Sequence, residues 1–144
     1  MPKQRLLPPL VLALLLGTVL WLRGPSFAIP LWNVDESIHA AVARTLLDGG
    51  TLYRDAIDQR TPLTYYAVAA IFGVAGANNL FAVRLVLAGL IAFTAFGLFL
   101  LGRRARDLAT GLWAAGSFVA LSTNLLPGSD AFAFHTEWFA ILFT

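Results

Sequence analysis

The sequence contains no cysteine and few charged residues. Charged side chains make up 12% of the 144 residues, whereas a typical soluble domain has about 25%. Without cysteine, this stretch can form neither a disulfide framework nor a cysteine-ligated zinc site. The formal net charge of +2 at pH 7 lacks the basic excess that nucleic-acid-binding proteins carry, so no nucleic-acid partner is expected.

Hydrophobic residues, by contrast, make up 58% of the chain and fall into long uncharged runs. A membrane-spanning helix needs about 20 apolar residues to cross a hydrocarbon core of about 30 Å. Four runs are near that length, and a fifth is far shorter. They cover residues 6–22, 62–82, 85–102, 108–128 and 138–144. The sequence therefore predicts an all-α polytopic membrane protein that is embedded in the lipid bilayer, with this chain as its N-terminal part.

The first run has an alternative interpretation as a cleavable signal peptide. Basic residues precede it, and Ser26-Phe27-Ala28 resembles a small-residue cleavage site. Against this, the run is longer than the apolar part of most signal peptides, Arg23 follows it, and further apolar runs come after. We therefore treat it as a membrane span.

Positive charge predicts how the spans are oriented. Two basic residues precede the first run, which places the N-terminus in the cytoplasm. The arginine cluster within residues 103–106 is the strongest cytoplasmic marker. It is cytoplasmic only if residues 62–82 lie at the interface or re-enter the membrane, and full crossing of that run is the alternative. We prefer the first arrangement, which puts the loop 23–61 on the outer face of the plasma (inner) membrane.

This outer loop has the pattern of an amphipathic helix. Asp35 and Glu36 open it, and acidic residues suit the first turn of a helix. Gly49-Gly50 ends it. Such a helix lies on the membrane surface with its apolar stripe inward. The stripe recurs at helical spacing, at Ile38, Val42 and Leu46.

The same helix carries the first candidate site residues. Asp35 and His39 are four residues apart and share a helical face, while Glu36 lies next to Asp35. Carboxylates with an imidazole suit general acid–base chemistry or a divalent metal ion, which is the candidate cofactor. Simple helix capping is the alternative role for Asp35 and Glu36.

A second polar group follows the run 108–128, which returns to the outer face. Asp130, His135 and Glu137 therefore arrive on the same side as Asp35. Glu137 adjoins a new apolar run and sits near membrane depth, where ionisable residues are usually functional. His135 is a second candidate metal ligand, and the alternative role for Asp130 is to end a membrane helix.

The order of several short motifs is informative as a set. In sequence they are Asp35-Glu36, Gly49-Gly50, Asp58-Gln59-Arg60-Thr61-Pro62-Leu63, Asn78-Asn79 and Arg84-Leu85. This order resembles the start of membrane glycosyltransferases of the GT-C fold, and it is most similar to dolichyl-phosphate-mannose–protein mannosyltransferases and lipid A aminoarabinose transferases.

The resemblance implies an enzyme that moves a sugar from a polyprenyl-phosphate donor to a protein, lipid or glycan acceptor at the outer face. It implies that Asp35 is the general base or positions the acceptor, and that Glu137 is a second acidic site residue. Glu36, Asp58 and Asp130 would support them. The aminoarabinose transferases tend to have glutamate where this chain has Arg60, a difference that leaves metal, donor and acceptor open.

The chemistry of such a transfer fits these residue types. A sugar leaves its lipid carrier as a phosphate anion, which needs positive charge nearby. Arg60 and Arg54 are candidates to supply it, and Arg84 is a weaker one. The acceptor hydroxyl must lose a proton to a carboxylate such as Asp35, and direct attack opposite the phosphate inverts the anomeric centre. The chain alone is expected to be inactive.

Two other classes of function remain as alternatives. A transporter or permease fragment would place charges and broken helices at mid-membrane depth, whereas the polar groups here cluster at the outer interface. A non-catalytic membrane scaffold would use Asp35 and Glu36 only as a helix cap.

Overall fold

The computed structural model describes residues 3–28 and 34–124. They form five helices, and within these two ranges the only β pairing is an isolated bridge between Leu52 and Ala56. The all-α class predicted from the sequence is therefore confirmed for the described residues. The helices are α1 (Lys3–Ala28), α2 (Val34–Leu47), α3 (Pro62–Ala75), α4 (Leu80–Ala105) and α5 (Leu108–Asn124).

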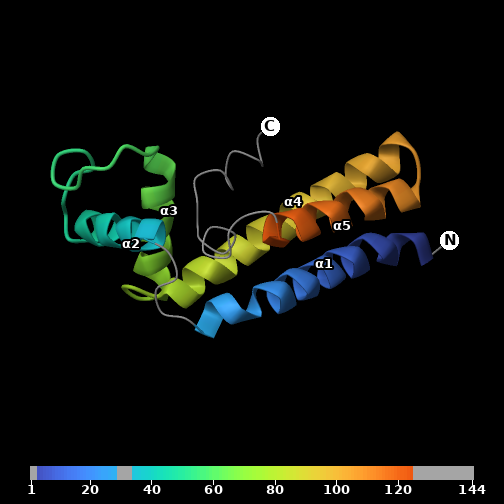
Figure 1. The fold of residues 1–144 in the computed structure, drawn as a ribbon, viewed down its shortest axis with the longest axis horizontal. Coiled ribbons are helices and arrows are strands. Elements are labelled where there is room, and N and C mark those ends of the chain that lie inside the picture. Colours follow the sequence, from blue (N-terminus) through green and yellow to red (C-terminus); the bar gives the residue numbers. More distant parts are fainter. Residues whose placement is uncertain (1–2, 29–33, 125–144) are drawn as a thin grey trace.

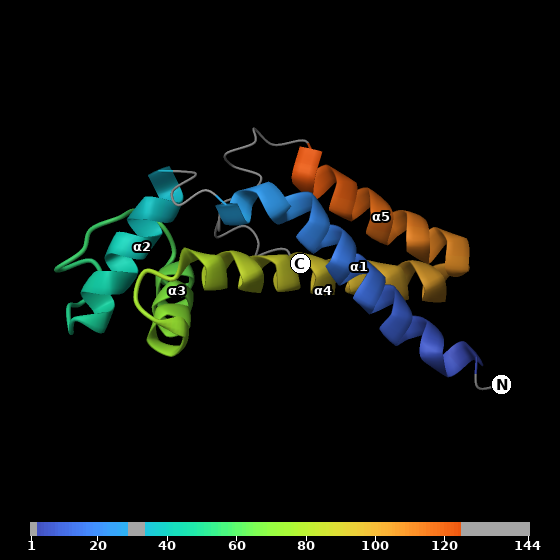
Figure 2. The ribbon, with the colours of Figure 1, turned by 90° about the horizontal axis from the view of Figure 1, so that it is seen from below.

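The long helices form a bundle and the short ones gather at one of its ends. Helix α4 packs against both α1 and α5, while α2 packs against α3 beside the N-terminal end of α4 (Figure 1). The start of α1 and the turn between α4 and α5 lie together at the opposite end (Figure 2). The arginines of residues 103–106 therefore share an end with the start of α1, and Asp35, in the first turn of α2, lies at the other end.

Within residues 3–28 and 34–124, two helices are long and apolar enough to cross a membrane. They are the Leu7–Ala28 part of α1 and the whole of α4. Both extend beyond the runs expected from the sequence, because α1 continues through Arg23 and α4 includes Arg84. Helix α3 has only 14 residues, so it is about 21 Å long and shorter than a hydrocarbon core of about 30 Å.

Helix α4 supplies most of the core. Its buried side chains repeat along one face and belong to the same core cluster as residues of α1 and α5. They include Leu87, Ile91, Ala95 and Phe99. Helices α4 and α5 come close because glycines face each other. A Cβ on Gly111 would lie 2.5 Å from the Phe99 carbonyl oxygen, and one on Gly102 would lie 2.9 Å from the Gly111 Cα. Small residues commonly permit such close helix pairs in membranes.

A tight turn separates α3 from α4. Gly76 and Asn78 have φ values of 101° and 63°, in the left-handed region that glycine and asparagine tolerate best. Asn79 then caps α4, because its side-chain oxygen accepts a hydrogen bond from the Ala82 N–H at 3.1 Å. The apolar run of residues 62–82 is thus split into two helices with different directions (Figure 1).

Candidate functional site

Asp35 and Arg60 meet at the end of the bundle that holds α2 and α3. Asp35 lies in the first turn of α2, and Arg60 precedes α3. The Arg60 guanidinium donates a hydrogen bond from Nη2 to Oδ2 of Asp35 at 2.5 Å. Their side chains keep 30% and 28% of their surface exposed. A carboxylate and a cation that were 25 residues apart in sequence thus form one partly accessible ion pair.

The segment around Arg60 is held by two tyrosine hydroxyls. Tyr53 donates a hydrogen bond to the Arg60 carbonyl oxygen at 2.6 Å. Tyr65, in the first half of α3, donates one to Oδ2 of Asp58 at 2.5 Å. Neither tyrosine is among the site residues predicted from the sequence.

The Tyr65–Asp58 hydrogen bond shifts the pKa of both groups. It lowers the pKa of the Asp58 carboxyl below its usual range, since the bond favours the charged form. Burial, followed by the bond to Asp58, raises the pKa of the Tyr65 hydroxyl. His39 of α2 packs edge-on against the Tyr65 ring, with centroids 5.5 Å apart. His39 and Tyr65 are both buried, so the side chains next to the Asp35–Arg60 pair are closely packed.

Glu36 points to a different partner from its neighbour Asp35. Its carboxylate accepts a hydrogen bond from Nε of Arg84 at 2.9 Å and a second from Nη2. Arg84 also donates from Nη1 to the Ser26 carbonyl oxygen at the end of α1. Both side chains are only 2% exposed. The pair therefore joins α1, α2 and α4, and Arg84 is placed in the interior rather than beside Arg60.

The remaining candidates fall elsewhere. Arg54 is 73% exposed and pairs with its neighbour Asp55 at 2.8 Å. Asp130, His135 and Glu137 lie outside the described residues. Among the residues that are described, no group of three or more His, Asp or Glu side chains could hold a metal ion.

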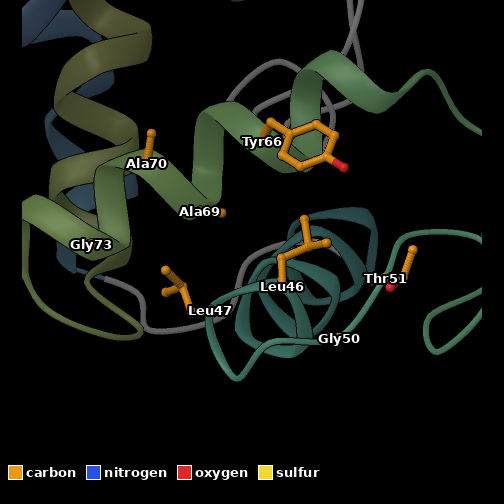
Figure 3. Close-up of a pocket in the computed structure, with 8 residues that line it drawn as sticks. All are labelled: Leu46, Leu47, Gly50, Thr51, Tyr66, Ala69, Ala70 and Gly73. Carbon is orange, nitrogen blue, oxygen red and sulfur yellow. The ribbon is translucent and has the colours of Figure 1, made fainter.

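An open groove of about 470 Å³ lies between the C-terminal end of α2 and helix α3. It is mostly apolar, and the side chains of Thr51 and Tyr66 supply its hydroxyl groups (Figure 3). The groove lies at the opposite end of α2 from Asp35. Its lining residues are Leu46, Leu47, Gly50, Thr51, Tyr66, Ala69, Ala70 and Gly73.

The geometry brings together part of the predicted site. Asp35, Asp58 and Arg60 lie around the start of α3, and His39 packs against Tyr65 next to them. Glu36 and Arg84 form a separate interior pair.

Comparison of the chain with protein-family models, curated proteins and solved structures gave no match.

Proposed function

We propose that this chain is the N-terminal part of a polytopic membrane glycosyltransferase of GT-C type. It would transfer a sugar from a polyprenyl-phosphate donor to an acceptor at the outer face of the membrane. The observation that carries the proposal is the accessible Asp35–Arg60 ion pair, at the end of the bundle opposite the arginines of residues 103–106. A base and an anion-binding cation are the two groups that this transfer requires.

In the proposed reaction the acceptor hydroxyl oxygen attacks the anomeric carbon of the sugar. The bond between that carbon and the phosphate oxygen breaks, and its electron pair leaves with the polyprenyl phosphate. Asp35 takes the hydroxyl proton, and Arg60 stabilises the charge that develops on the phosphate. Attack from the face opposite the phosphate inverts the configuration.

The ion pair also suggests how the base becomes available. Without donor, the Arg60 guanidinium satisfies the Asp35 carboxylate. The phosphodiester of the donor is also an anion, and two of its oxygens can engage the planar arginine fork together. As Arg60 turns toward the phosphate, Asp35 is released to accept the acceptor proton. Donor binding would therefore precede activation of the base.

The membrane position follows from charge and from exposed apolar residues. The arginine-rich end of the bundle would face the cytoplasm, so α2 and α3 would lie at the outer interface. Leu63 and Val74, in the first and last turns of α3, are 52% and 93% exposed. Contact with lipid would remove these apolar side chains from water. A lipid-linked donor could then reach Arg60 from within the bilayer.

The test is a transfer assay with the full-length protein in lipid nanodiscs. A panel of labelled polyprenyl-phosphate hexoses and pentoses serves as donor, and release of polyprenyl phosphate is measured. We expect Asp35→Asn to lower release by at least about 100-fold, a typical loss for a general base. Asp48→Asn is the control and should retain activity, because Asp48 is exposed and follows the last residue of α2.

Undiminished release by Asp35→Asn would refute the catalytic role of Asp35. A wild-type protein that neither binds nor turns over any donor of the panel would refute the glycosyltransferase proposal itself.

A further inference from the structure

The short segment that carries Arg60 is fixed by a hydroxyl at each of its ends. The Tyr65 hydroxyl holds the Asp58 side chain at 2.5 Å, and the Tyr53 hydroxyl holds the Arg60 carbonyl oxygen at 2.6 Å. Both bonds reach across seven residues of sequence. Neither bond is made to the Arg60 guanidinium, so the two bonds hold the segment and leave the Arg60 side chain to turn between partners.

Tyr53 holds an unusual conformation for a bulky residue. Its φ is +66°, in the left-handed region where side chains other than Gly, Asn and Asp are uncommon. Its N–H donates to the Ala56 carbonyl oxygen at 2.9 Å, which closes a small loop. The reversal of the chain at this loop lets the Tyr53 hydroxyl reach Arg60. Backbone strain of this kind is often retained at functional sites.

Tyr65 ties the segment to the helix that carries Asp35. Its ring is fully buried and meets the edge of His39, one turn after Asp35 on α2. The ring is therefore fixed by α2, and its hydroxyl fixes Asp58, two residues before Arg60. Through this chain of contacts the position of Arg60 is set relative to Asp35.

We propose that Tyr53 and Tyr65 are positioning residues that hold Arg60 opposite Asp35, at the place where the donor phosphate binds. The phosphate part of this proposal rests on the proposed glycosyltransferase function. The position of Arg60 itself can be measured without any donor, so the two proposals can fail separately.

The first experiment uses hydroxyl deletions in the full-length protein. Tyr53→Phe and Tyr65→Phe each remove one hydrogen bond and keep the ring, so packing is retained. We expect each to raise the donor KM by about 3- to 10-fold, the range for one lost hydrogen bond, with a smaller change in kcat. Tyr66→Phe is the matched control, because Tyr66 adjoins Tyr65 but faces the groove (Figure 3).

Coupling to Arg60 separates positioning from a general structural effect. In an Arg60→Gln background, Tyr53→Phe should change the donor KM by less than about twofold, because the group that it positions has been removed. Equal effects in both backgrounds, or an equal effect of Tyr66→Phe, would overturn the proposal.

The second experiment needs no donor. The stretch contains no cysteine, so Asp35→Cys with Arg60→Cys introduces its only two thiols. The Tyr53 bond is made to the backbone carbonyl of residue 60 and survives this change. We expect a short bismaleimide to link the two thiols, and Tyr53→Phe or Tyr65→Phe to slow linking at least about threefold, as expected for one lost hydrogen bond.

Unchanged linking in both tyrosine variants would overturn the positioning role, whatever the donor assay gives. Slower linking in a protein that binds no polyprenyl-phosphate donor would keep the positioning role and refute the proposed function.

Discussion

The Glu36 carboxylate and the Arg84 guanidinium form a buried ion pair at the point where α1, α2 and α4 meet. Each side chain is 2% exposed, and Arg84 also donates to the Ser26 carbonyl oxygen at the end of α1. Removing one partner of such a pair leaves the other charged and buried. This pair therefore ties the first turn of α2, which presents Asp35, to the two long helices.

We predict that Glu36→Ala and Arg84→Ala each lower the free energy of unfolding by about 3–5 kcal/mol, the usual cost of breaking a buried pair. Thermal unfolding in detergent measures this. Arg54→Ala is the control, since its pair with Asp55 is exposed and solvent screens it. Equal unfolding temperatures for Arg84→Ala and Arg54→Ala would contradict the prediction.

The Asp35–Arg60 pair leads to a prediction about donor binding. If the donor phosphate competes with Asp35 for Arg60, Asp35→Asn should bind a polyprenyl-phosphate donor at least as tightly as wild type while losing transfer. Arg60→Gln should weaken binding by about tenfold or more, because a charged hydrogen bond is lost. Equilibrium binding of a labelled donor measures both. Weaker binding by Asp35→Asn would show that Asp35 helps Arg60 rather than competing for it.

The helix ends with strong local signals could be predicted from the sequence. Gly49, which has a positive φ, lies just after the end of α2. Pro62 is the first residue of α3, a position that proline favours. The C-terminal end of α1 and the N-terminal end of α4 could not be predicted in this way. Arg23 and Arg84 read as charges outside the membrane runs, yet both are buried within helices, because their surroundings come from helices distant in sequence.

The site could be predicted in part. The sequence drew attention to Asp35 and Glu36 together, but consecutive residues on a helix point about 100° apart, so they meet different arginines. Which carboxylate meets which arginine depends on the packing of α2 against the bundle. The bond from Tyr53 to Arg60 depends on the left-handed turn at Tyr53, which residue propensity does not predict.

The Tyr65–Asp58 bond predicts a pH-dependent stability. The folded-state pKa of Asp58 is lowered from 3.8, so its contribution is present above pH 3.8 and is lost as the pH falls through the lowered value. The folded-state pKa of Tyr65 is raised from 10.0, so its contribution is present below pH 10.0 and is lost at higher pH.

We therefore predict that wild type is more stable than Tyr65→Phe at pH 7, and that the difference shrinks below about pH 4 as Asp58 is protonated. Thermal unfolding temperatures of both proteins at pH 3 and pH 7 measure it. The same difference at both pH values would show that the hydroxyl is not acting through the charged form of Asp58.

The close approach of α4 and α5 predicts a contrast between two glycines of α5. Gly111→Ala would place a Cβ 2.5 Å from a backbone oxygen of α4, whereas a Cβ on Gly116 meets nothing within 4 Å. We expect Gly111→Ala to lower the unfolding temperature, because the helices must separate. Gly116→Ala should keep or raise it, since alanine favours helix by about 1 kcal/mol. Equal effects would argue against the close packing.

The last prediction concerns which side of the membrane each end of the bundle faces. Ile57 precedes α3, Ala77 lies in the turn after it, and Arg106 follows α4. All three are exposed, so each is a suitable site for a single cysteine. If α3 lies at the outer interface, Ile57→Cys and Ala77→Cys should react with a membrane-impermeant thiol reagent on intact cells. Arg106→Cys should react only after permeabilisation.

Full crossing by α3 gives the opposite pattern. The turn at Ala77 would then face the cytoplasm and Arg106 would face outward, so their labelling would be exchanged, while Ile57→Cys would still react. The short length of α3 favours the first pattern, because 14 residues do not span the hydrocarbon core. The turn after α4 lies at the same end of the bundle as the start of α1 (Figure 2), and this also favours the first pattern, because one cytoplasmic side then collects the basic residues. Exchanged labelling would move α3 into the membrane and place the arginine cluster on the same side as Asp35, in conflict with their positions at opposite ends of the bundle.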